Sequence, residues 1–512
     1  MNGAESLVHT LLACGVDTCF ANPGTSEMHF VAALDRIPGM RCVLGLFEGV
    51  VTGAADGYSR MAEKPAATLL HCGPGLANGI ANLHNGRRAH TMMVNCVGDQ
   101  ATYHRPLDAP LTADTAGLAR TVSGWTRTAS RAVDVGADAA SAVQAAFEGP
   151  GQIATLILPS DTCWDEGGIV GVPLPRPNRV PASPEIIAQI ARVIRRGERV
   201  AMVLGHGALR AAPITSAAAI AAAMPGVELW AQTSNPRIER GTGRHIINRI
   251  PYPTDQAVAA LAGVKHVILV GAQDPVGFFA YPNKPSRIAP PDADVHVLAR
   301  VEHDLPATLA ALADLLGAKA PPPQARDTTG PATGKVTSEG LAQSLTALMP
   351  ENTIITDESV SFGRALYGNM HGAPPHDWVQ LCGGAIGEGM PLAVGAAIAC
   401  PDRRVVNLQA DGSGMYTLQS LWTMARERLD VTVIILANRK YQILLGEYFN
   451  VGANPGPTAM NMLDLGNPDL DWVKMAAGMG VEGVAVETMD AFNDAFAAAN
   501  KRRGPFLIEL VI

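Results

Sequence analysis

Asp411 and Asn438 have the residue types and spacing that could bind a divalent metal ion. Asp411 comes soon after the apolar segment 403–408, and Asn438 follows a second apolar segment, 431–436. Residues 415–426 have the apolar periodicity of a helix, which predicts a crossover between two parallel strands. Both side chains would then lie at the carboxyl ends of neighbouring strands, where open α/β sheets bind ligands.

These two side chains suit Mg²⁺, which prefers oxygen ligands such as carboxylates and amides. Gly412 and Ser413 would open the predicted helix and offer backbone N–H groups, and the positive end of the helix dipole, to a phosphate. One metal ion held between these oxygens and a diphosphate would account for the arrangement. The alternative is an ordinary strand–helix–strand unit in which Asp411 and Asn438 occur by chance.

Glu48 is a third candidate, because it ends the apolar segment 41–48, which is predicted to be a strand. A helix rich in small residues is predicted from about Gly49. A carboxylate at the end of an apolar strand costs free energy unless it has a partner. Either Glu48 serves a ligand, or it belongs to the helix N-cap region and is satisfied by the backbone amides of its own helix.

Two further polar loops follow predicted strands near the N-terminus. The segment 21–27 ends the first strand with a Pro-Gly turn, and His71 follows the strand 66–70. Asn-Pro-Gly alone is an ordinary turn signal, and a single histidine after a strand is more often structural. Because three polar groups follow three strands, we expect Thr25, Glu48 and His71 to converge on one crevice.

The composition is that of a well-packed α/β protein and excludes several classes of function. Of the 512 residues, 47% are apolar and 17% are charged. The net charge of −8 and the lack of a basic run argue against a nucleic-acid partner. No apolar stretch reaches membrane-spanning length, so we expect no membrane partner. The eight cysteines form no Cys-x-x-Cys motif, which is typical of reduced thiols and predicts a cytoplasmic location.

Two proline-rich segments, 167–184 and 318–334, are predicted linkers. A chain of this length is expected to contain several domains. The linkers predict three consecutive domains, at 1–167, 185–317 and 335–512. We expect each to be of the α/β class, with a mostly parallel sheet flanked by helices.

The segment around Asp411 resembles the fingerprint of thiamine-diphosphate-dependent enzymes, which reads Gly-Asp-Gly and, further on, Asn-Asn. Ala410 and Ala437 depart from this pattern, whereas Asp411 and Asn438 are kept. The resemblance implies thiamine diphosphate and Mg²⁺ as cofactors. It also implies that the metal ligands are Asp411, Asn438 and the backbone carbonyl of Lys440.

The segment 46–58 resembles the family's motif around its activating glutamate. By this resemblance, Glu48 would hydrogen-bond to N1′ of the aminopyrimidine and favour the tautomer that removes the C2 proton. Thr25 and His71 would bind the substrate carboxylate and shuttle protons. Ile386 would wedge between the two rings of the cofactor, and the carbonyl of Gly384 would accept from its 4′-amino group. The other residues expected to bind the cofactor are Asn22, Pro23, Ser359, Ser361, Gly412 and Ser413.

The resemblance covers the whole chain, as pyrimidine-binding, middle and diphosphate-binding domains, and is strongest to the benzoylformate decarboxylases. It implies decarboxylation of a small 2-oxo acid, with carboligation as a further outcome. The alternatives are an acetolactate-synthase-like or 2-hydroxyacyl lyase/synthase carboligase, and a catalytically silent homologue that acts as an assembly partner. Glu48 argues against silence. A homodimer is the expected minimal active unit, and a homotetramer is expected to be common.

The chain departs from the decarboxylase pattern at the second catalytic histidine. The matching segment, 277–281, contains Phe278, Phe279 and Tyr281, which could line a substrate pocket or cover the edge of a sheet. His104 could replace the missing histidine. Glu388 stands where an apolar residue is expected, and it could reach the substrate or point to solvent.

Overall fold

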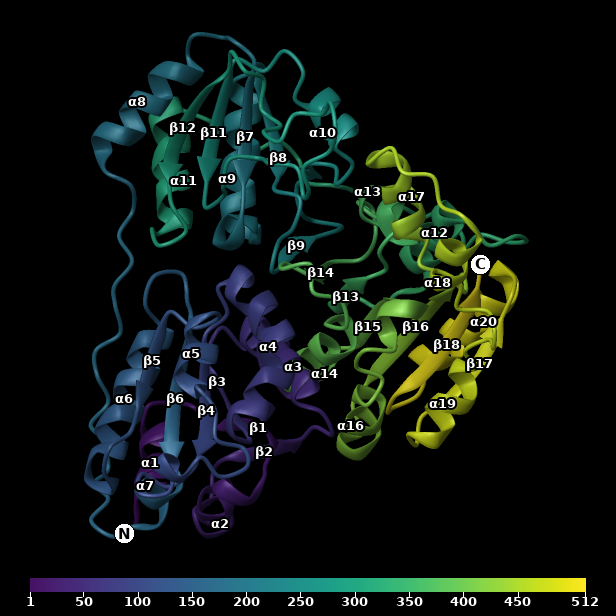
Figure 1. Cartoon of the computed structure of the whole chain (residues 1–512). Helices are drawn as coiled ribbons and strands as arrows, with labels where there is room; N and C mark the ends of the chain where they lie inside the picture. The colour runs from purple at the N-terminus through teal and green to yellow at the C-terminus, as the bar shows by residue number, and fades with distance from the viewer.

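All 512 residues are described in the computed structural model, and they form three mostly parallel sheets flanked by helices (Figure 1). This architecture confirms the predicted α/β fold class. The apolar segments form the sheet centres, because strands covered on both faces must bury every side chain. The strand β16 (Val431–Ala437), for example, is buried along its whole length.

The first sheet is parallel throughout and has the strand order β2-β1-β3-β4-β6-β5. Its strands are β1 (Thr18–Asn22), β2 (Arg41–Leu44), β3 (Ala66–Leu70), β4 (Met93–Asp99), β5 (Trp125–Thr128) and β6 (Ile153–Pro159). Its helices are α1 (Gly3–Ala13), α2 (Met28–Arg36), α3 (Glu48–Ala62), α4 (Cys72–Ala89), α5 (Thr115–Arg120), α6 (Val135–Ala146) and α7 (Ser160–Trp164).

The second sheet is also parallel and has the order β10-β8-β7-β11-β12. Its strands are β7 (Val200–Leu204), β8 (Val227–Ala231), β10 (Asn248–Arg249), β11 (His266–Val270) and β12 (Asp294–Ala299). The helices of this part are α8 (Pro184–Ile194), α9 (Ala211–Ala223), α10 (Thr254–Ala260) and α11 (Leu305–Leu316).

The third sheet has the order β17-β18-β16-β15-β13-β14-β9. Besides β16, its strands are β9 (Ile238–Arg240), β13 (Thr353–Glu358), β14 (His376–Gln380), β15 (Val405–Ala410), β17 (Glu482–Val486) and β18 (Phe506–Val511). Its helices are α12 (Ser338–Leu348), α13 (Leu366–Asn369), α14 (Gly389–Ala399), α15 (Asp411–Gly414), α16 (Ser420–Glu427), α17 (Gln442–Asn450), α18 (Pro457–Met462), α19 (Trp472–Gly478) and α20 (Met489–Asn500).

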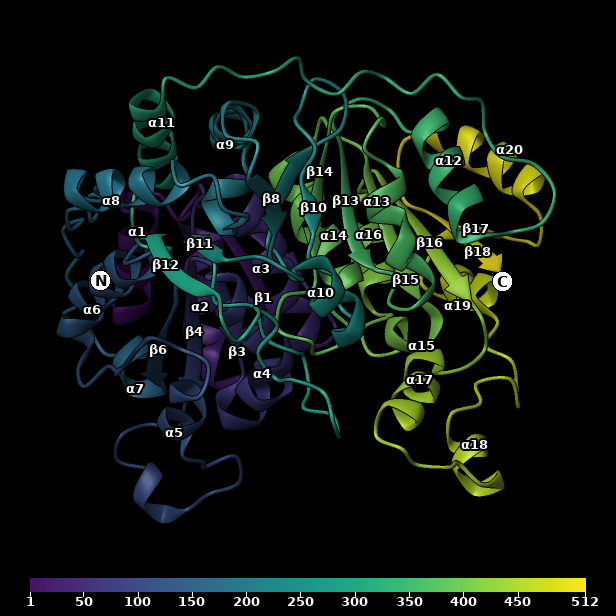
Figure 2. The ribbon, with the colours of Figure 1, turned by 90° about the horizontal axis from the view of Figure 1, so that it is seen from above.

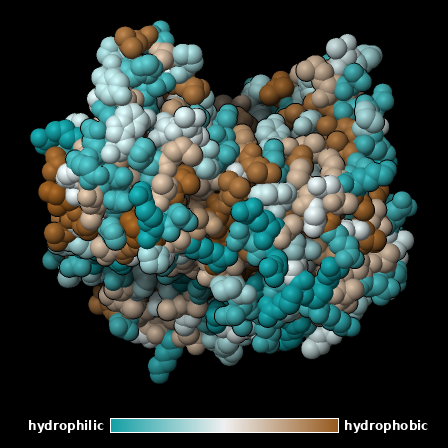
Figure 3. All heavy atoms as spheres, turned by 90° about the horizontal axis from the view of Figure 1, so that it is seen from below, coloured by the Kyte–Doolittle hydropathy of each residue, from teal (hydrophilic) through white to brown (hydrophobic).

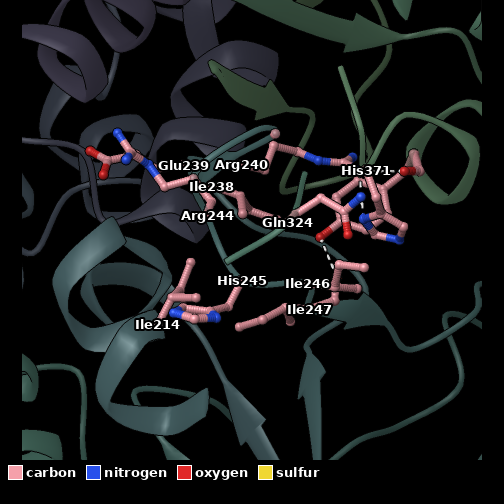
Figure 4. A pocket seen from close by; sticks show the side chains of 12 residues that line it. Ile214, Ile238, Glu239, Arg240, Arg244, His245, Ile246, Ile247, Gln324 and His371 are labelled. Carbon is pink, nitrogen blue, oxygen red and sulfur yellow. Dashed lines mark hydrogen bonds between the residues drawn. The ribbon is translucent and has the colours of Figure 1, made fainter. Parts of the chain in front are cut away.

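Strand β9 connects the middle of the chain to the third sheet, a feature that the sequence did not predict. It pairs antiparallel with β14, so that Ile238 lies opposite Trp378. The buried guanidinium of Arg240 lies 3.7 Å from the centroid of the Tyr367 ring. Its Nη2 lies 3.1 Å from Nδ1 of His371, and the two side chains face each other in Figure 4. Burial lowers the pKa of Arg240 to about 10. These contacts hold strand β9, and with it the part of the chain that carries the second sheet, against the third sheet.

Helices α3 and α14 join the first and third sheets at close range. A Cβ added at Gly57 would overlap the carbonyl oxygen of Leu392, and one added at Gly395 would overlap that of Ala54. Glycine at both positions therefore allows the two backbones to touch. One apolar core accordingly contains residues from both parts of the chain, such as Val51 and Leu392.

The helix predicted over 415–426 is interrupted, which corrects the sequence-based expectation. The structure has the short helix α15, a turn, and then α16. In the turn, Thr417 donates a hydrogen bond of 2.8 Å to the carbonyl of Gly387, and Tyr416 packs against the same glycine. The interruption places these side chains against the loop that precedes α14.

Two segments project on the same side of the molecule, one between β4 and α5 and the other at α17 and α18 (Figure 2). Seen from below, the surface is hollowed between two raised lobes, and apolar and polar residues are interspersed on it (Figure 3).

None of the helices combines the length and apolar character needed to cross a bilayer.

Candidate active site

Glu48 is the first residue of α3, not the last residue of a strand, because β2 already ends at Leu44. The residue is 8% exposed, and its carboxylate accepts a hydrogen bond of 3.0 Å from the side-chain amide of Asn78 on α4. No cationic side chain pairs with it, and its own helix amides donate no hydrogen bond to it. The alternative of a self-satisfied N-cap carboxylate is therefore wrong.

His71 caps the N-terminus of α4 and lies close to Glu48 and to the turn after β1. A Cβ added at Gly75 would lie 3.1 Å from Oε1 of Glu48 and 3.3 Å from Cβ of His71, so both residues border this glycine. Thr25 opens the short 3₁₀ helix Thr25–Glu27 and is exposed, and its hydroxyl forms no hydrogen bond within the chain. The three strand-end loops therefore meet as expected.

A buried glutamate, Glu27, holds the imidazole of His71. Oε2 of Glu27 lies 3.0 Å from Nδ1 of His71, and Glu27 as a whole is only 3% exposed. The hydroxyl of Ser26 lies 3.3 Å from the same nitrogen. The second nitrogen, Nε2, has no partner in the chain and is the one available for a substrate.

Asp411 lies at the end of β15, beside the end of β16, as the sequence predicts. It is 3% exposed, and it accepts hydrogen bonds from the backbone N–H of Gly412 (2.8 Å) and Arg439 (2.6 Å). Burial raises the pKa of the Asp411 carboxyl, while these amides lower it. No cationic side chain forms an ion pair with Asp411. A buried carboxylate without a cation fits a bound Mg²⁺.

Asn438 follows β16 directly and is half-buried. Its side-chain oxygen accepts a hydrogen bond of 3.1 Å from the backbone N–H of Lys440. Ser413 is held at the first turn of α15 by Gln409, whose side-chain amide donates to its hydroxyl at 2.7 Å. Thus the residues expected to bind a metal and a diphosphate all lie at the ends of two adjacent strands.

The glycine-rich loop 381–388 is fixed by Glu358, a residue that the sequence did not single out. The fully buried Glu358 carboxylate accepts from the backbone N–H groups of Gly387 and Gly389, both at 2.6 Å. In the same loop Gly384 has a φ of +81° and lies against the Phe278 ring, and Ile386 is half-exposed. Burial raises the pKa of Glu358, whereas the amide donors lower it.

Glu388 neither reaches the substrate side nor points to solvent, which corrects both expectations. It is completely buried, and its Oε1 lies 3.2 Å from Nη2 of Arg60. The same guanidinium binds Asp56 at 2.5 Å. Burial raises the pKa of Glu388 well above its usual range. The cluster Asp56–Arg60–Glu388 thus lies between the first and third sheets.

Other expected site residues lie apart from these contacts. Ser359 is buried, and its hydroxyl donates to Asp357 at 2.5 Å. Ser361 forms no side-chain hydrogen bond. His104 is half-buried on the projecting segment after β4, where no hydrogen bond links it to His71 or Glu48.

The polar residues form two half-sites within a single chain. No hydrogen bond or ion pair joins the first group (Thr25, Glu27, Glu48 and His71) to the second group (Asp411, Ser413, Asn438 and Lys440). The first group can bind a nitrogen base and move protons, and the second can bind a metal ion and phosphate oxygens.

Comparison with known proteins shows why one chain carries these two half-sites. Residues 1–118 match the model of the N-terminal thiamine pyrophosphate (TPP) binding domain of thiamine pyrophosphate enzymes. Residues 364–510 match the model of the C-terminal TPP binding domain. The chain belongs to the thiamine pyrophosphate enzyme family. The two matches contain the first and second half-sites respectively, so the predicted family is confirmed.

Several members of this family resemble the chain along its whole length. A Mycobacterium tuberculosis protein provisionally named acetolactate synthase large subunit IlvX is 51% identical, with 100% of this chain and 99% of that protein covered. Benzoylformate decarboxylase of Pseudomonas aeruginosa is 28% identical, with 97% and 96% covered. The structure of thiamine diphosphate-dependent 4-hydroxybenzoylformate decarboxylase from Rhodococcus jostii is similar with a TM-score of 0.84 and 26% identity, covering 99% of this chain and 98% of that one.

Sequence reasoning missed Glu27, Asn78 and Glu358 as parts of the half-sites. Glu27 stands in the same loop as Thr25, so its position offered a signal, but its burial against His71 was not apparent. Asn78 and Glu358 belong to no recognisable motif in the sequence. Only their hydrogen bonds in the folded structure, to Glu48 and to the glycine-rich loop respectively, show that they support the half-sites.

Proposed function

We propose that this family member decarboxylates a small 2-oxo acid, using thiamine diphosphate and Mg²⁺. The observation that supports the proposal is the pair of buried, cation-free carboxylates, Glu48 and Asp411, one in each half-site. A buried carboxylate without a cation is costly unless hydrogen-bond donors or a ligand supply partners for its oxygens, and Glu48 accepts only one hydrogen bond within the chain. An aminopyrimidine nitrogen suits Glu48, and a divalent ion suits Asp411.

The second half-site would bind the metal ion and the diphosphate of the cofactor. Asp411, Asn438 and the carbonyl of Lys440 would hold Mg²⁺, and Gly412 and Ser413 would hold phosphate oxygens. When bound, thiamine diphosphate supplies a cationic ring that accepts the electron pair left by departing CO₂.

In the other half-site, Glu48 would hold a proton on the pyrimidine nitrogen. His71, oriented by Glu27, would present Nε2 to the substrate and move a proton there. Thr25, which is exposed beside His71, would bind the substrate carboxylate. Ile386 and the carbonyl of Gly384 would orient the cofactor rings. The other residues proposed to contact the cofactor are Asn22, Pro23, Ser359 and Ser361.

We propose that two copies of the chain combine their half-sites, with a homodimer as the minimal active unit and a homotetramer as the larger assembly. Large apolar side chains are exposed in both parts of the chain that carry the half-sites. They include Leu46 beside Glu48, and Tyr416, Phe449 and Met462 in the part that follows Asp411. Burial of such side chains against a second copy would stabilise the assembly.

Carboligation is the second candidate function, and the segment 277–281 favours it. Phe278 lies against Gly384 where the decarboxylase pattern has a second histidine, so this segment supplies no imidazole to protonate the carbon that loses CO₂. An activated substrate that is protonated slowly has more time to react with a second carbonyl compound. The similarity to a protein named acetolactate synthase large subunit also supports this candidate.

A panel of 2-oxo acids separates these functions. The purified protein, supplied with thiamine diphosphate and Mg²⁺, is assayed for CO₂, for free aldehyde and for carbon–carbon-bonded products. We expect CO₂ release in the wild type, and a loss of about 10²- to 10⁴-fold in Glu48→Gln. Glu487→Gln, at an exposed glutamate, is the matched control. Full turnover in Glu48→Gln would contradict the assignment of Glu48, and CO₂ appearing only with coupled products would favour the carboligase.

A further inference from the structure

The middle sheet carries a cluster of histidine and carboxylate side chains that belongs to neither half-site. His266 opens β11, and Asp294 opens β12, the neighbouring edge strand. The parallel register places His266 opposite Asp294. Because side chains alternate along a strand, Asp294 and His296 lie on one face of the sheet together with His266.

A fourth side chain joins this face by the same logic. Val200 at the start of β7 lies opposite His266, so Glu198, two residues earlier, is on the same side. Its carboxylate Oε2 lies 3.0 Å from Nε2 of His266. One ring nitrogen of His266 is thereby oriented by a carboxylate, which leaves Nδ1 directed at the other two side chains.

The distances between the ligand atoms suit one metal ion. Nδ1 of His266 lies 3.2 Å from Nε2 of His296 and 3.7 Å from Oδ2 of Asp294. One ligand atom from each of the three residues lies within 4.8 Å of the others. Zinc binds histidine nitrogens at about 2.0–2.1 Å, so two nitrogens on a tetrahedral ion are roughly 3.3 Å apart. The observed separation of the imidazole nitrogens is close to this value.

We propose that His266, His296 and Asp294 bind a divalent transition-metal ion of the zinc class, with Glu198 as the outer carboxylate that orients His266. Two imidazoles and one carboxylate favour zinc and its neighbours over Mg²⁺ or Ca²⁺. A histidine ligand whose other nitrogen contacts a carboxylate is the usual arrangement in metal sites. The ion would fasten the edge strand β12 to β11.

The surroundings leave the cluster accessible to an ion. His266 is buried, whereas the side chains of Asp294 and Glu198 are 71% and 47% exposed. The nearby Lys265 is paired with Asp292 at 2.6 Å and does not occupy Asp294. Arg196 is close enough to affect the pKa of His296, but no ion pair joins it to either carboxylate. The cluster lies at the amino ends of its strands, whereas the cofactor residues follow the carboxyl ends of strands in the other sheets.

Zinc titration of the full-length protein tests the proposal. Tag-free, metal-stripped protein, saturated with thiamine diphosphate and Mg²⁺, is titrated with Zn²⁺ by calorimetry. We expect saturable binding of a single ion per chain. Asp294→Asn and His296→Gln should each lower the affinity at least about tenfold, and Glu198→Gln roughly 10- to 100-fold. His9→Gln, at an exposed histidine of α1, is the matched control and should bind as the wild type does.

Two further measurements assign the bound zinc to this cluster. Glu27, His71 and Cys72 also bring ligand atoms within 4.8 Å of one another, so the titration is repeated in a His71→Gln background, where the proposed site should persist. Co²⁺ bound in place of Zn²⁺ should give a visible absorption band that His296→Gln removes. Circular dichroism checks that each variant is folded. Binding by folded Asp294→Asn and His296→Gln as tight as that of His9→Gln would overturn the proposal, as would the absence of saturable binding in the wild type.

Discussion

Nδ1 of His71 lies 3.0 Å from Oε2 of Glu27, and the Glu27 carboxylate is buried beneath the turn that follows β1. The contact leaves Nε2 of His71 free and fixes the direction of the ring. Glu27 fits into its place because Gly98, on β4, has no side chain. A Cβ at Gly98 would overlap Oε1 of Glu27.

Gly98→Ala should therefore change the orientation of the His71 imidazole indirectly, through Glu27. We expect the added methyl group to displace the Glu27 carboxylate and to lower kcat on the order of tenfold, because a misoriented catalytic group lowers the rate without preventing binding. Steady-state kinetics and thermal unfolding measure the two effects separately. Gly478→Ala, at a helical glycine with no neighbour within 4 Å, is the control. Wild-type kcat in folded Gly98→Ala would contradict a positioning role for Glu27.

Asp411→Asn should weaken retention of the cofactor. The substitution removes the charge that would bind Mg²⁺ while keeping the shape of the side chain. We expect the affinity for thiamine diphosphate in the presence of Mg²⁺ to fall on the order of a hundredfold, or about 2.8 kcal/mol. Calorimetric titration of the cofactor, with and without Mg²⁺, measures it. Asp494→Asn, at an exposed aspartate of α20, should match the wild type. Equal affinity in both variants would show that the metal lies elsewhere.

Removing the cation from the buried cluster Asp56–Arg60–Glu388 should lower the free energy of unfolding strongly. Arg60→Met leaves Asp56 buried without a cation, and we expect a loss of about 3–5 kcal/mol in the free energy of unfolding. Arg131→Met breaks an exposed pair with Asp134 and should cost less than about 1 kcal/mol. Denaturant unfolding compares the two. Equal losses would mean that the buried cluster contributes no more than a surface pair.

Glu388 should make stability depend on pH in a defined direction. An unfolded glutamate loses its proton near a pKa of about 4.3, and burial places the folded pKa higher. Between these two pKa values the folded protein holds a proton that the unfolded chain has lost, so the free energy of unfolding falls as pH rises. Glu388→Gln should reduce this fall and be as stable as the wild type, or more so, at neutral pH. Unfolding midpoints measured at several pH values test it, and an unchanged pH dependence would contradict a raised pKa.

Gly395→Ala should separate the two helices that join the first and third sheets. The new Cβ would overlap the backbone of Ala54, and flexible side chains cannot relieve this overlap. We expect a loss of about 1–3 kcal/mol from overpacking. Gly446→Ala, in α17 with no neighbour within 4 Å, is the helical control. A Gly395→Ala protein as stable as this control would show that the helices can move apart without cost.

The sequence alone determined the α/β class, the cofactor family and the positions of His71, Asp411 and Asn438 directly after strands, whereas Glu48 proved to begin a helix. These features are local. Apolar periodicity defines each strand, and the residue that follows a strand lies at the carboxyl end of that strand. The segment 431–436, for example, becomes the buried strand β16, with Asn438 directly after its end.

The tertiary structure alone decided which polar groups contact one another. Glu388 lies 328 positions from Arg60 in the chain, and Glu27 lies 44 positions from His71. The residues around Glu388 do not indicate its contact, which depends on how α3 and α14 pack between two sheets. Glu27 lies in a loop that was expected to approach His71, but only the folded structure shows that its carboxylate is buried against the imidazole. The same reason applies to β9, whose pairing with β14 depends on the position of the middle segment against the third sheet.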